Sequence, residues 1–318
     1  MKRRWEKQPW GGLVPPTLLF LFIFVPCTSP FPSTRTFNAI FNLHHPSSLP
    51  PPAPPPPPPS SSTTLACQDT SVSWTPYKVD YTYITDEQWQ QLDDLASLMT
   101  DWNIKVNLVS RKDIDALIPT HIAPCLAINL FFEDIGCVFP GGSRVIDVGT
   151  GGGLPGLPLA ICNPTSHFTL LDSNGKKMMV VEDIMTKLKL NNVKVVKARA
   201  EDIQTEKFDY MLGRSVSAVP TFLGFSSHFI DDTSDAIRSG LLYIKGGDFT
   251  EELKTAQIVE YDILAIRNLT KLDTDKNLLH IPSIEICNFH RRKVELHEEE
   301  KLNKKNNKKQ KHRYRRRK

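Results

Sequence analysis

The segment VIDVGTGGGLPG, residues 145–156, decides the fold. Its opening VIDV is apolar except for Asp147, as expected of a short buried strand, and glycine fills five of the eight positions that follow. Pro155 stands near the position where a helix would begin, and proline is well tolerated there. Glycine lets the backbone approach a ligand closely and point its N–H groups at it. The segment therefore predicts a strand, a ligand-binding loop and a helix in succession.

Short apolar runs and longer helical runs alternate after this segment. Predicted strands cover residues 144–148, 167–171, 193–197, 208–212 and 240–245, with further strands within 259–266 and 278–286; predicted helices cover 157–162 and 176–190. This alternation is typical of a parallel sheet covered by helices on both faces. We therefore predict an α/β fold with a doubly wound, mostly parallel sheet.

A helical addition is predicted before the sheet. Thr85 and Gln88 have the S/T-x-x-E/Q spacing of a capping box, which opens a helix. Six apolar residues then recur at helical spacing and predict an amphipathic helix: Trp89, Leu92, Leu95, Ala96, Met99 and Trp102. A second helix is predicted over residues 114–132, where two prolines disturb its boundaries.

Composition divides the chain into three parts. Residues 1–66 hold most of the chain's 25 prolines and a single acidic residue, and a proline tract within them cannot pack into a core. The last 18 residues contain no acidic residue, and most are Lys or Arg. We predict a Pro-rich targeting segment over 1–66, one α/β domain with N-terminal helices over 74–292, and a basic, disordered tail over 293–318.

The N-terminal segment is compatible with two destinations. Four cations precede the apolar run 18–25, which resembles a secretory signal and is too short for a membrane span. The Ser-, Thr- and Pro-rich stretch that follows is typical of an organelle transit peptide. Composition alone leaves secretion and organelle import equally open.

The cysteine pattern predicts neither a metal site nor a disulfide framework. Six cysteines are scattered without C-x-x-C spacing: Cys27, Cys67, Cys125, Cys137, Cys162 and Cys287. We expect reduced thiols and no bound metal.

Acidic residues at successive strand ends indicate the ligand. Gly151, Gly153 and Gly156 fit the dinucleotide pattern G-x-G-x-x-G, which a purely structural turn also fits. Asp172 ends the second predicted strand, where a carboxylate can accept both ribose hydroxyls of an adenosine, or cap the next helix. Glu201 follows the third strand, within reach of an adenine edge. Together with Asp147, these features favour S-adenosylmethionine over NAD.

Seven segments, in this order, carry a resemblance to a known family. They are WNIKVNLVS (102–110), His121-Ile122, IDVGTGGGLPGLPLA (146–160), FTLLDS-x-x-KK (168–177), ARAED (198–202), GRSVSA (213–218) and YIKGG (243–247). The chain resembles the bacterial 16S ribosomal RNA guanine-N7 methyltransferases, also called glucose-inhibited division protein B. Two departures are Pro124-Cys125, where the family often has Asp-Ser, and the thin likeness beyond residue 247.

The resemblance implies a fold, a cofactor and a substrate. The fold is that of the class I S-adenosylmethionine methyltransferases, and the substrate is N7 of a guanine in small-subunit rRNA or an assembling ribosomal subunit. A monomer without stable membrane association is expected. In the family, five matching residues contact the methyl donor: Gly149, Leu154, Ala200, Glu201 and Arg214. To these we add Gly151, Gly153 and Asp172 from the loop and strand pattern.

The expected chemistry requires few catalytic residues. Guanine N7 has an in-plane lone pair and no proton, so placement of donor and base suffices. Arg214 and Lys245 follow the fourth and fifth predicted strands, at the edge where ligands bind in such folds. We assign them to catalysis, as contacts to RNA phosphate or guanine O6 and to the donor's surroundings; solvated cations are the alternative. His121 is either a core or capping residue or an RNA contact.

Other functions remain open at this stage. A methyltransferase for another RNA or a small molecule, a non-catalytic RNA-binding protein and, more remotely, an NAD dehydrogenase each fit part of the pattern. The basic tail suits nonspecific RNA affinity, a solubilising extension or a nuclear localisation patch. A bacterial-type ribosomal enzyme with a long Ser/Pro-rich extension is expected in a plant organelle, the chloroplast or, alternatively, the mitochondrion.

Overall fold

A computed structural model describes residue 81 and residues 83–132, 139–231, 234, 236–270 and 272–315. The predicted targeting segment 1–66 and its apolar run lie outside the described residues, as do Cys27, Cys67 and Cys137. Among the described helices, none is long and apolar enough to cross a bilayer.

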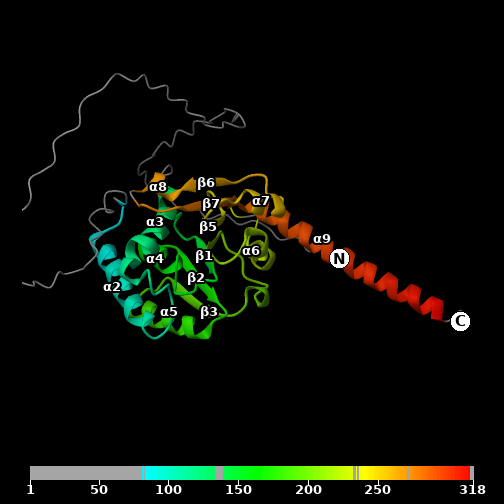
Figure 1. Ribbon diagram of the computed structural model, residues 1–318, viewed down its shortest axis with the longest axis horizontal. Coiled ribbons are helices and arrows are strands. Elements are labelled where there is room, and N and C mark those ends of the chain that lie inside the picture. Colours follow the sequence, from blue (N-terminus) through cyan, green and yellow to red (C-terminus); the bar gives the residue numbers. More distant parts are fainter. Residues whose placement is uncertain are drawn as a thin grey trace, which may run out of the picture. The chain divides into compact units, whose positions relative to one another are not determined.

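A seven-stranded sheet forms the centre of the domain (Figure 1), in the order β3-β2-β1-β4-β5-β7-β6. The strands are β1 (Arg144–Val148), β2 (His167–Asp172), β3 (Val193–Lys197), β4 (Tyr210–Arg214), β5 (Gly240–Gly246), β6 (Asp262–Ala265) and β7 (Lys276–Pro282). The first five pair in parallel, and β7 runs antiparallel to both β5 and β6. The prediction of a doubly wound, mostly parallel sheet is confirmed.

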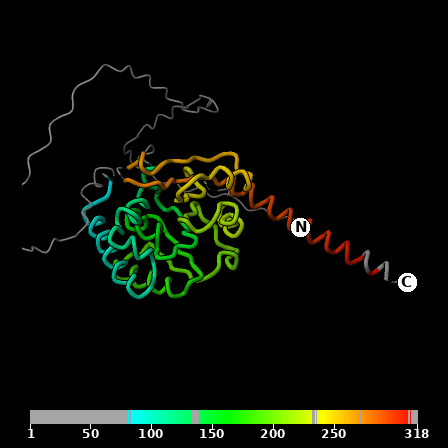
Figure 2. Tube along the Cα trace, in the orientation of Figure 1, coloured from blue at the N-terminus to red at the C-terminus, as the bar shows by residue number. Residues whose placement is uncertain are grey.

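Apolar cores lie on both faces of this sheet. Because successive strand residues point to opposite faces, Val145 of β1 packs in one core and its neighbour Ile146 in the other. The first core includes α2 (Asp86–Asn103), α3 (Ala123–Leu130), α4 (Gly156–Cys162), α5 (Gly175–Lys187) and α8 (Ile266–Leu269). The second includes α6 (Val219–Ser226), α7 (Thr250–Ala256) and the start of α9 (Ser283–Arg315). The two helix groups are visible on opposite sides of the sheet in Figure 2.

The helical addition begins with α2, as predicted. Thr85 Oγ1 accepts from the N–H of Gln88, and Gln88 Oε1 accepts from the N–H of Thr85, so the capping box is formed. The second predicted helix, over residues 114–132, is instead three short pieces: a 3-10 turn η1 (Ile114–Ala116), a π-helical turn η2 (Ile118–Ile122) and α3. Pro119 and Pro124 lack the N–H that a continuous α-helix requires, which explains the interruption.

Two boundaries differ from the predicted ones around the fourth and seventh strands. The fourth strand lies at 210–214 rather than 208–212, and Phe208 makes only an isolated bridge with Ile230. The last predicted strand region, 278–286, is strand to Pro282 and helix from Ser283. Side-chain periodicity does not fix where pairing starts, because that depends on the neighbouring strand.

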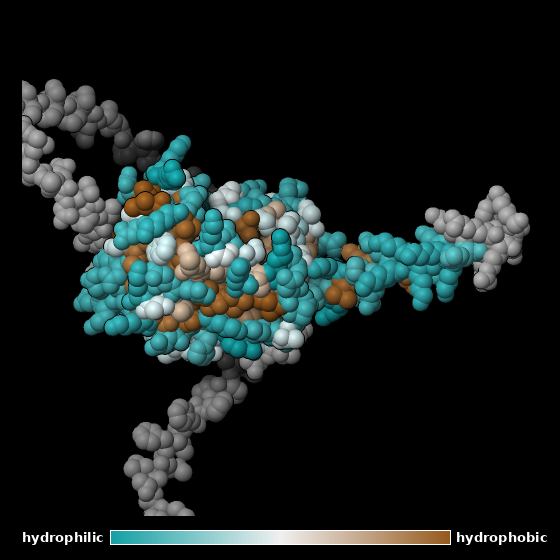
Figure 3. Space-filling model, turned by 90° about the horizontal axis from the view of Figure 1, so that it is seen from below, coloured by the Kyte–Doolittle hydropathy of each residue, from teal (hydrophilic) through white to brown (hydrophobic). Residues whose placement is uncertain are grey.

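The C-terminal tail is a correction to the sequence prediction. Where we expected disorder over residues 293–318, the structure has helix α9 continuing to Arg315. The segment 283–315 contains no glycine or proline and is rich in Lys, Glu and Arg, which favour helices. Lys304 and Glu300 pair across one turn at 3.5 Å. On the face seen in Figure 3, the part of α9 that extends from the domain is mostly hydrophilic.

Candidate functional site

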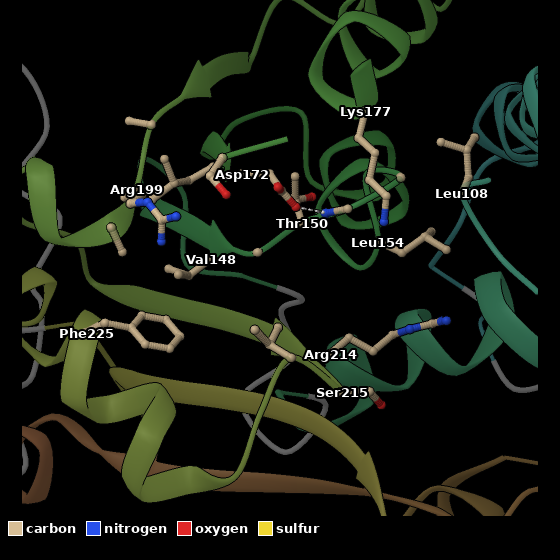
Figure 4. A pocket seen from close by; sticks show the side chains of 18 of the residues that line it. Leu108, Val148, Thr150, Leu154, Asp172, Lys177, Arg199, Arg214, Ser215 and Phe225 are labelled. Carbon is tan, nitrogen blue, oxygen red and sulfur yellow. Dashed lines mark hydrogen bonds between the residues drawn. The ribbon is translucent and has the colours of Figure 1, made fainter. Parts of the chain in front are cut away.

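A cavity of about 460 Å³ opens at the carboxyl ends of β1, β2 and β4. Its wall combines the glycine loop, the ends of β2 and β4, and the 3-10 turn η4 (Ala200–Asp202). In Figure 4, Arg199 and Phe225 lie at one end of this space, and Lys177, Leu154 and Leu108 at the other. Seven of the predicted donor-site residues line it: Gly149, Gly151, Leu154, Asp172, Ala200, Glu201 and Arg214.

The glycine loop needs its glycines for two different reasons. Gly149 and Gly151 line the cavity with φ of 74° and 59°, a conformation that side chains disfavour. Gly153 does not line the cavity. A Cβ on Gly153 would lie 2.3 Å from the Leu157 side chain, so this glycine permits the packing of the loop on α4. Gly153 therefore has a packing role in this structure, and its ligand contact stays a prediction.

Asp172 is not the cap of α5, one of the two roles that the sequence left open, and its contact with a ribose stays a prediction. Its Oδ2 accepts from the N–H of Gly151 at 3.0 Å, and its Oδ1 accepts from the N–H of Asn174 at 2.8 Å. The N-cap of α5 is Asn174 itself, whose side chain accepts from Lys176 and Lys177. Asp172 thus holds the glycine loop against β2 and still faces the cavity.

Asp147 fastens the glycine loop from below. The side chain is buried, and its Oδ2 accepts from Thr150 Oγ1 at 2.6 Å and from the N–H of Gly156 at 2.9 Å. Within the described part of the chain, Oδ1 has no hydrogen-bond partner. Burial raises the pKa of this carboxyl to about 6, against the opposing effects of its hydrogen bonds and of Arg214. Asp147 therefore shapes the loop without entering the cavity wall.

Arg214 is held in place by a neutral histidine. Its guanidinium donates to the His121 carbonyl at 2.7 Å and to His121 Nδ1. His121 Nε2 lies 3.2 Å from Asp113 Oδ2. Burial and the neighbouring Arg214 lower the pKa of His121 to about 4, although the Asp113 bond opposes this. The proton therefore resides on Nε2, which donates to Asp113, and Nδ1 accepts from Arg214. His121 positions Arg214.

The departure at Pro124-Cys125 leaves this contact intact. Cys125 Sγ donates to the His121 carbonyl at 3.0 Å and lies 3.8 Å from the Arg214 guanidinium. Burial raises the pKa of the Cys125 thiol. A neutral thiol can thus pack beside the Arg214 cation where the related family often has Ser.

Tyr243 clamps the loop that follows β4. Ser215 lines the cavity with a φ of 50°, unusual for a residue with a side chain. The next two N–H groups, of Val216 and Ser217, donate to the Tyr243 hydroxyl at 2.9 and 3.0 Å. That hydroxyl in turn donates to the Ser217 carbonyl at 2.8 Å.

Val216 connects this loop to the glycine loop. A Cβ on Gly149 would lie 3.1 Å from both Val216 methyl carbons, so the two loops are in close contact. The three hydrogen bonds of the Tyr243 hydroxyl thus fix the loop Ser215–Ser217, which is strained at Ser215, at the cavity wall.

Lys245 does not reach the cavity, contrary to expectation. Its ammonium pairs with Glu252 on α7, and Glu252 also accepts from the N–H of Val219 at 2.8 Å. The ammonium lies 5.9 Å from the centre of the Phe249 ring. In this structure Lys245 joins β5 to α6 and α7.

Sequence reasoning missed Lys276 as a neighbour of the site. Lys276 on β7 donates to the Thr120 carbonyl at 2.8 Å, in the turn that carries His121. Burial and the nearby Arg214 lower the pKa of Lys276. No motif surrounds this lysine, and only the antiparallel return of β7 beside β5 brings it here. The charged wall residues Lys177 and Arg199 were also missed.

The described residues contain no group of three or more His, Cys, Asp or Glu side chains suited to a metal ion. The described cysteines Cys125, Cys162 and Cys287 form no disulfide bond with one another.

Comparisons with known proteins point to one family. The family described as rRNA small subunit methyltransferase G matches residues 88–269. A ribosomal RNA small subunit methyltransferase G from Cytophaga hutchinsonii is 38% identical over 206 residues, covering 64% of this chain and 96% of the relative. The protein of the same name from Christiangramia forsetii is 41% identical over 181 residues, covering 56% and 83%. Among solved structures, precorrin-6y C5,15-methyltransferase from Geobacter metallireducens is 10% identical with a TM-score of 0.37, covering 54% and 88%.

Proposed function

We propose that this chain methylates N7 of a guanine in small-subunit rRNA. The proposal starts from its family, because the chain belongs to the rRNA small subunit methyltransferase G family. Membership makes it an rRNA methyltransferase that uses S-adenosylmethionine. The observation that carries the proposal is the cavity that gathers the glycine loop, Asp172, Glu201 and Arg214 in one wall.

The residues of the cavity fit the methyl donor. A volume of about 460 Å³ lies within the range usual for small-molecule sites. Asp172 and Glu201 supply carboxylates for donor hydroxyl and amino groups, and Gly149 and Gly151 leave the backbone accessible. When bound, S-adenosylmethionine supplies a methyl group activated by its sulfonium. Arg214, Ser215 and Val216 line the same cavity and would lie beside the target guanine.

The chain's own residues act by positioning. Because N7 carries a lone pair and no proton, no side chain has to remove a proton before the N7–carbon bond forms and the sulfur–carbon bond breaks. Arg214 offers a permanent cation near the reacting groups, suited to guanine O6 or an RNA phosphate. His121, neutral at physiological pH, holds that cation and serves as neither acid nor base.

We also propose that the enzyme acts in an organelle, the chloroplast first and the mitochondrion as the alternative. Support comes from the Ser-, Thr- and Pro-rich composition of residues 1–66 and from the bacterial relatives. A fluorescent protein fused after residue 66 should enter one of the two organelles. Entry into the secretory pathway would contradict the proposal.

One experiment tests the activity. N7-methylguanosine is mapped in organellar small-subunit RNA from cells with the protein, without it, and with its Gly151→Val variant. We expect one position to lose the mark without the protein and to regain it only with the wild type, because a valine at the φ of 59° would distort the donor loop. Undiminished N7-methylation in the absence of the protein would exclude this function. Loss of a different methyl mark would indicate another RNA target atom.

A further inference from the structure

Helix α9 continues well beyond its contacts with the domain. Its first turns pack on α6, η5 (Ser227–Phe229) and the sheet, with Ile286 buried. Among the described residues, the last hydrogen bonds from α9 to the rest of the domain are those of Arg292 to the carbonyls of Ala256 and Gln257, and of Lys293 to that of Gly224. All described side chains from residue 293 onward are exposed. The distal half of α9 therefore presents its whole circumference to solvent.

Six basic residues of this distal half lie along one side of the helix. Lys301, Lys304, Lys305, Lys308, Lys309 and His312 are spaced i, i+3, i+4, i+7, i+8 and i+11. At 3.6 residues per turn and 1.5 Å per residue, this spacing makes a single stripe about 16 Å long. We call these six residues the basic stripe. It carries five permanent charges, and no acidic residue follows Glu300.

The surroundings of the basic stripe limit what can bind it. Asn303, Asn306 and Asn307 occupy the opposite side of the helix, so no apolar face is available for insertion into a membrane surface. The basic stripe itself contains no Phe, Tyr or Trp on which an unpaired base would stack, and the one aromatic residue that follows it is Tyr314. Glu298, Glu299 and Glu300 would repel a polyanion, so contact begins at Lys301.

We propose that the basic stripe docks on the phosphate backbone of a double-helical segment of the rRNA substrate. Regularly spaced phosphates of an A-form duplex match a rigid row of cations, and such duplexes are recognised by shape and backbone rather than by sequence. The proposal rests on the rRNA substrate proposed above. It assigns α9 a docking role outside the methyl-transfer cavity, whose lining includes no residue of α9.

The arrangement of the charges distinguishes this docking from the attraction of any basic tail. A disordered tail attracts RNA through its net charge, which is unchanged by reordering its residues. A helical stripe requires its cations on one side. Exchanging three neighbouring Lys/Asn pairs therefore separates the two mechanisms at constant composition and charge.

The test compares three full-length proteins. The stripe-broken variant carries Asn303→Lys, Lys304→Asn, Lys305→Asn, Asn306→Lys, Asn307→Lys and Lys308→Asn, which moves three lysines to the opposite side. The charge-removed variant carries Lys304→Gln, Lys305→Gln, Lys308→Gln and Lys309→Gln. Binding to a 20-base-pair RNA duplex is measured by fluorescence anisotropy from 50 to 300 mM KCl. Circular dichroism checks that both variants keep the helix content of the wild type.

We expect the charge-removed variant to flatten the slope of log affinity against log salt by about 3, because each phosphate contact contributes roughly 0.7–0.9. In the stripe-broken variant the slope should decrease by at least half as much as in the charge-removed variant. Its affinity at 100 mM KCl should fall about tenfold. Equal slopes for the stripe-broken variant and the wild type would overturn the proposal.

Donor affinity and methyl transfer to small-subunit rRNA are measured on the same preparations. Donor affinity should be unchanged in both variants. If the wild type binds the duplex through the basic stripe but transfers no methyl group to rRNA, the proposed function fails while the docking surface stands. If it transfers methyl groups and the stripe-broken variant binds like the wild type, only the docking surface fails.

Discussion

At the scale of single residues, the Tyr243 hydroxyl makes more contacts in the site than its sequence position suggested. In the segment YIKGG, the sequence pattern predicted a catalytic role for Lys245. In the structure Lys245 pairs with Glu252, whereas Tyr243 binds the loop that forms part of the cavity wall. Tyr243→Phe should keep the ring packing on Phe222, whose ring centre lies 4.9 Å away. It should remove all three hydrogen bonds of the hydroxyl.

We expect Tyr243→Phe to lower the single-turnover rate of methyl transfer by about tenfold, since a loop misplaced by a fraction of an ångström loses alignment of donor and base. Donor affinity, measured by calorimetry, should change by less than threefold, because Asp172 and the glycine loop are untouched. A variant that loses donor affinity and keeps its rate would show that the clamp serves the donor instead of the target base.

Asp147 gives a prediction about stability and pH. Its pKa is about 6 in the folded protein against its ordinary value of 3.8, so folding favours the protonated form. The folded state therefore loses stability as pH rises through this interval, by roughly 3 kcal/mol for about two pKa units. Asn cannot ionise, so Asp147→Asn should lack this loss.

Urea unfolding of wild type and Asp147→Asn at several pH values checks this. The stability of the variant relative to the wild type should increase between about pH 4 and pH 6 and be constant above. The pKa of His121 is lowered to about 4, so His121 makes the folded protein less stable as pH falls. This effect is present in both proteins and cancels in the difference between their stabilities. A difference independent of pH would mean that Asp147 titrates normally.

At the scale of secondary-structure elements, the sequence correctly predicted the elements that depend on interactions between residues close in sequence. The capping box at Thr85, the apolar strand β1 and the glycine loop are each specified by neighbours in sequence, and each is confirmed. The sequence prediction missed the start of β4, the π-helical turn η2 and the continuation of α9. The first two depend on partners elsewhere in the fold, and the third on continuous helix propensity.

Gln88 both caps α2 and connects the start of that helix to α4. Its Oε1 closes the capping box, while its Nε2 donates to the carbonyls of Ile161 and Cys162 at the end of α4, at 3.0 and 3.2 Å. Thr85→Ala should therefore cost about 1 kcal/mol of unfolding free energy, and Gln88→Ala about 2 kcal/mol. Urea denaturation measures both, with Thr85→Ser as the control that keeps the cap. Equal costs would show that the bonds to α4 contribute nothing.

At the scale of the whole molecule, the site is assembled from parts far apart in sequence. Arg214 from β4, His121 and Asp113 from the helical addition, and Lys276 from the antiparallel return form one charged cluster. The glycine loop and the acids after β2 and β3 could be located from the sequence because each follows a predicted strand. The His121–Arg214 contact could not, because it spans 93 residues and depends on how η2 packs over the sheet.

This assembly leads to a prediction about the pH dependence of catalysis. Two titratable groups beside Arg214 have pKa values displaced from the range of a general base: His121 at about 4 and the Cys125 thiol raised. Asp147, with a pKa of about 6, is buried and does not line the cavity. Since N7 attack requires no proton removal, the single-turnover rate should vary by less than about twofold between pH 6.5 and 8.5. Rapid quenching with saturating donor and rRNA measures this rate.

Two variants make the pH test specific. His121→Gln should preserve the flat profile, because its imidazole is already neutral throughout this interval, although Arg214 is then held less firmly. Arg214→Ala should lower the rate by at least tenfold at every pH, since a permanent cation is lost rather than a base. A wild-type rate that rises tenfold per pH unit and becomes flat in His121→Gln would identify His121 as a base. The target would then be an amine or a hydroxyl, because only those groups must lose a proton on methylation.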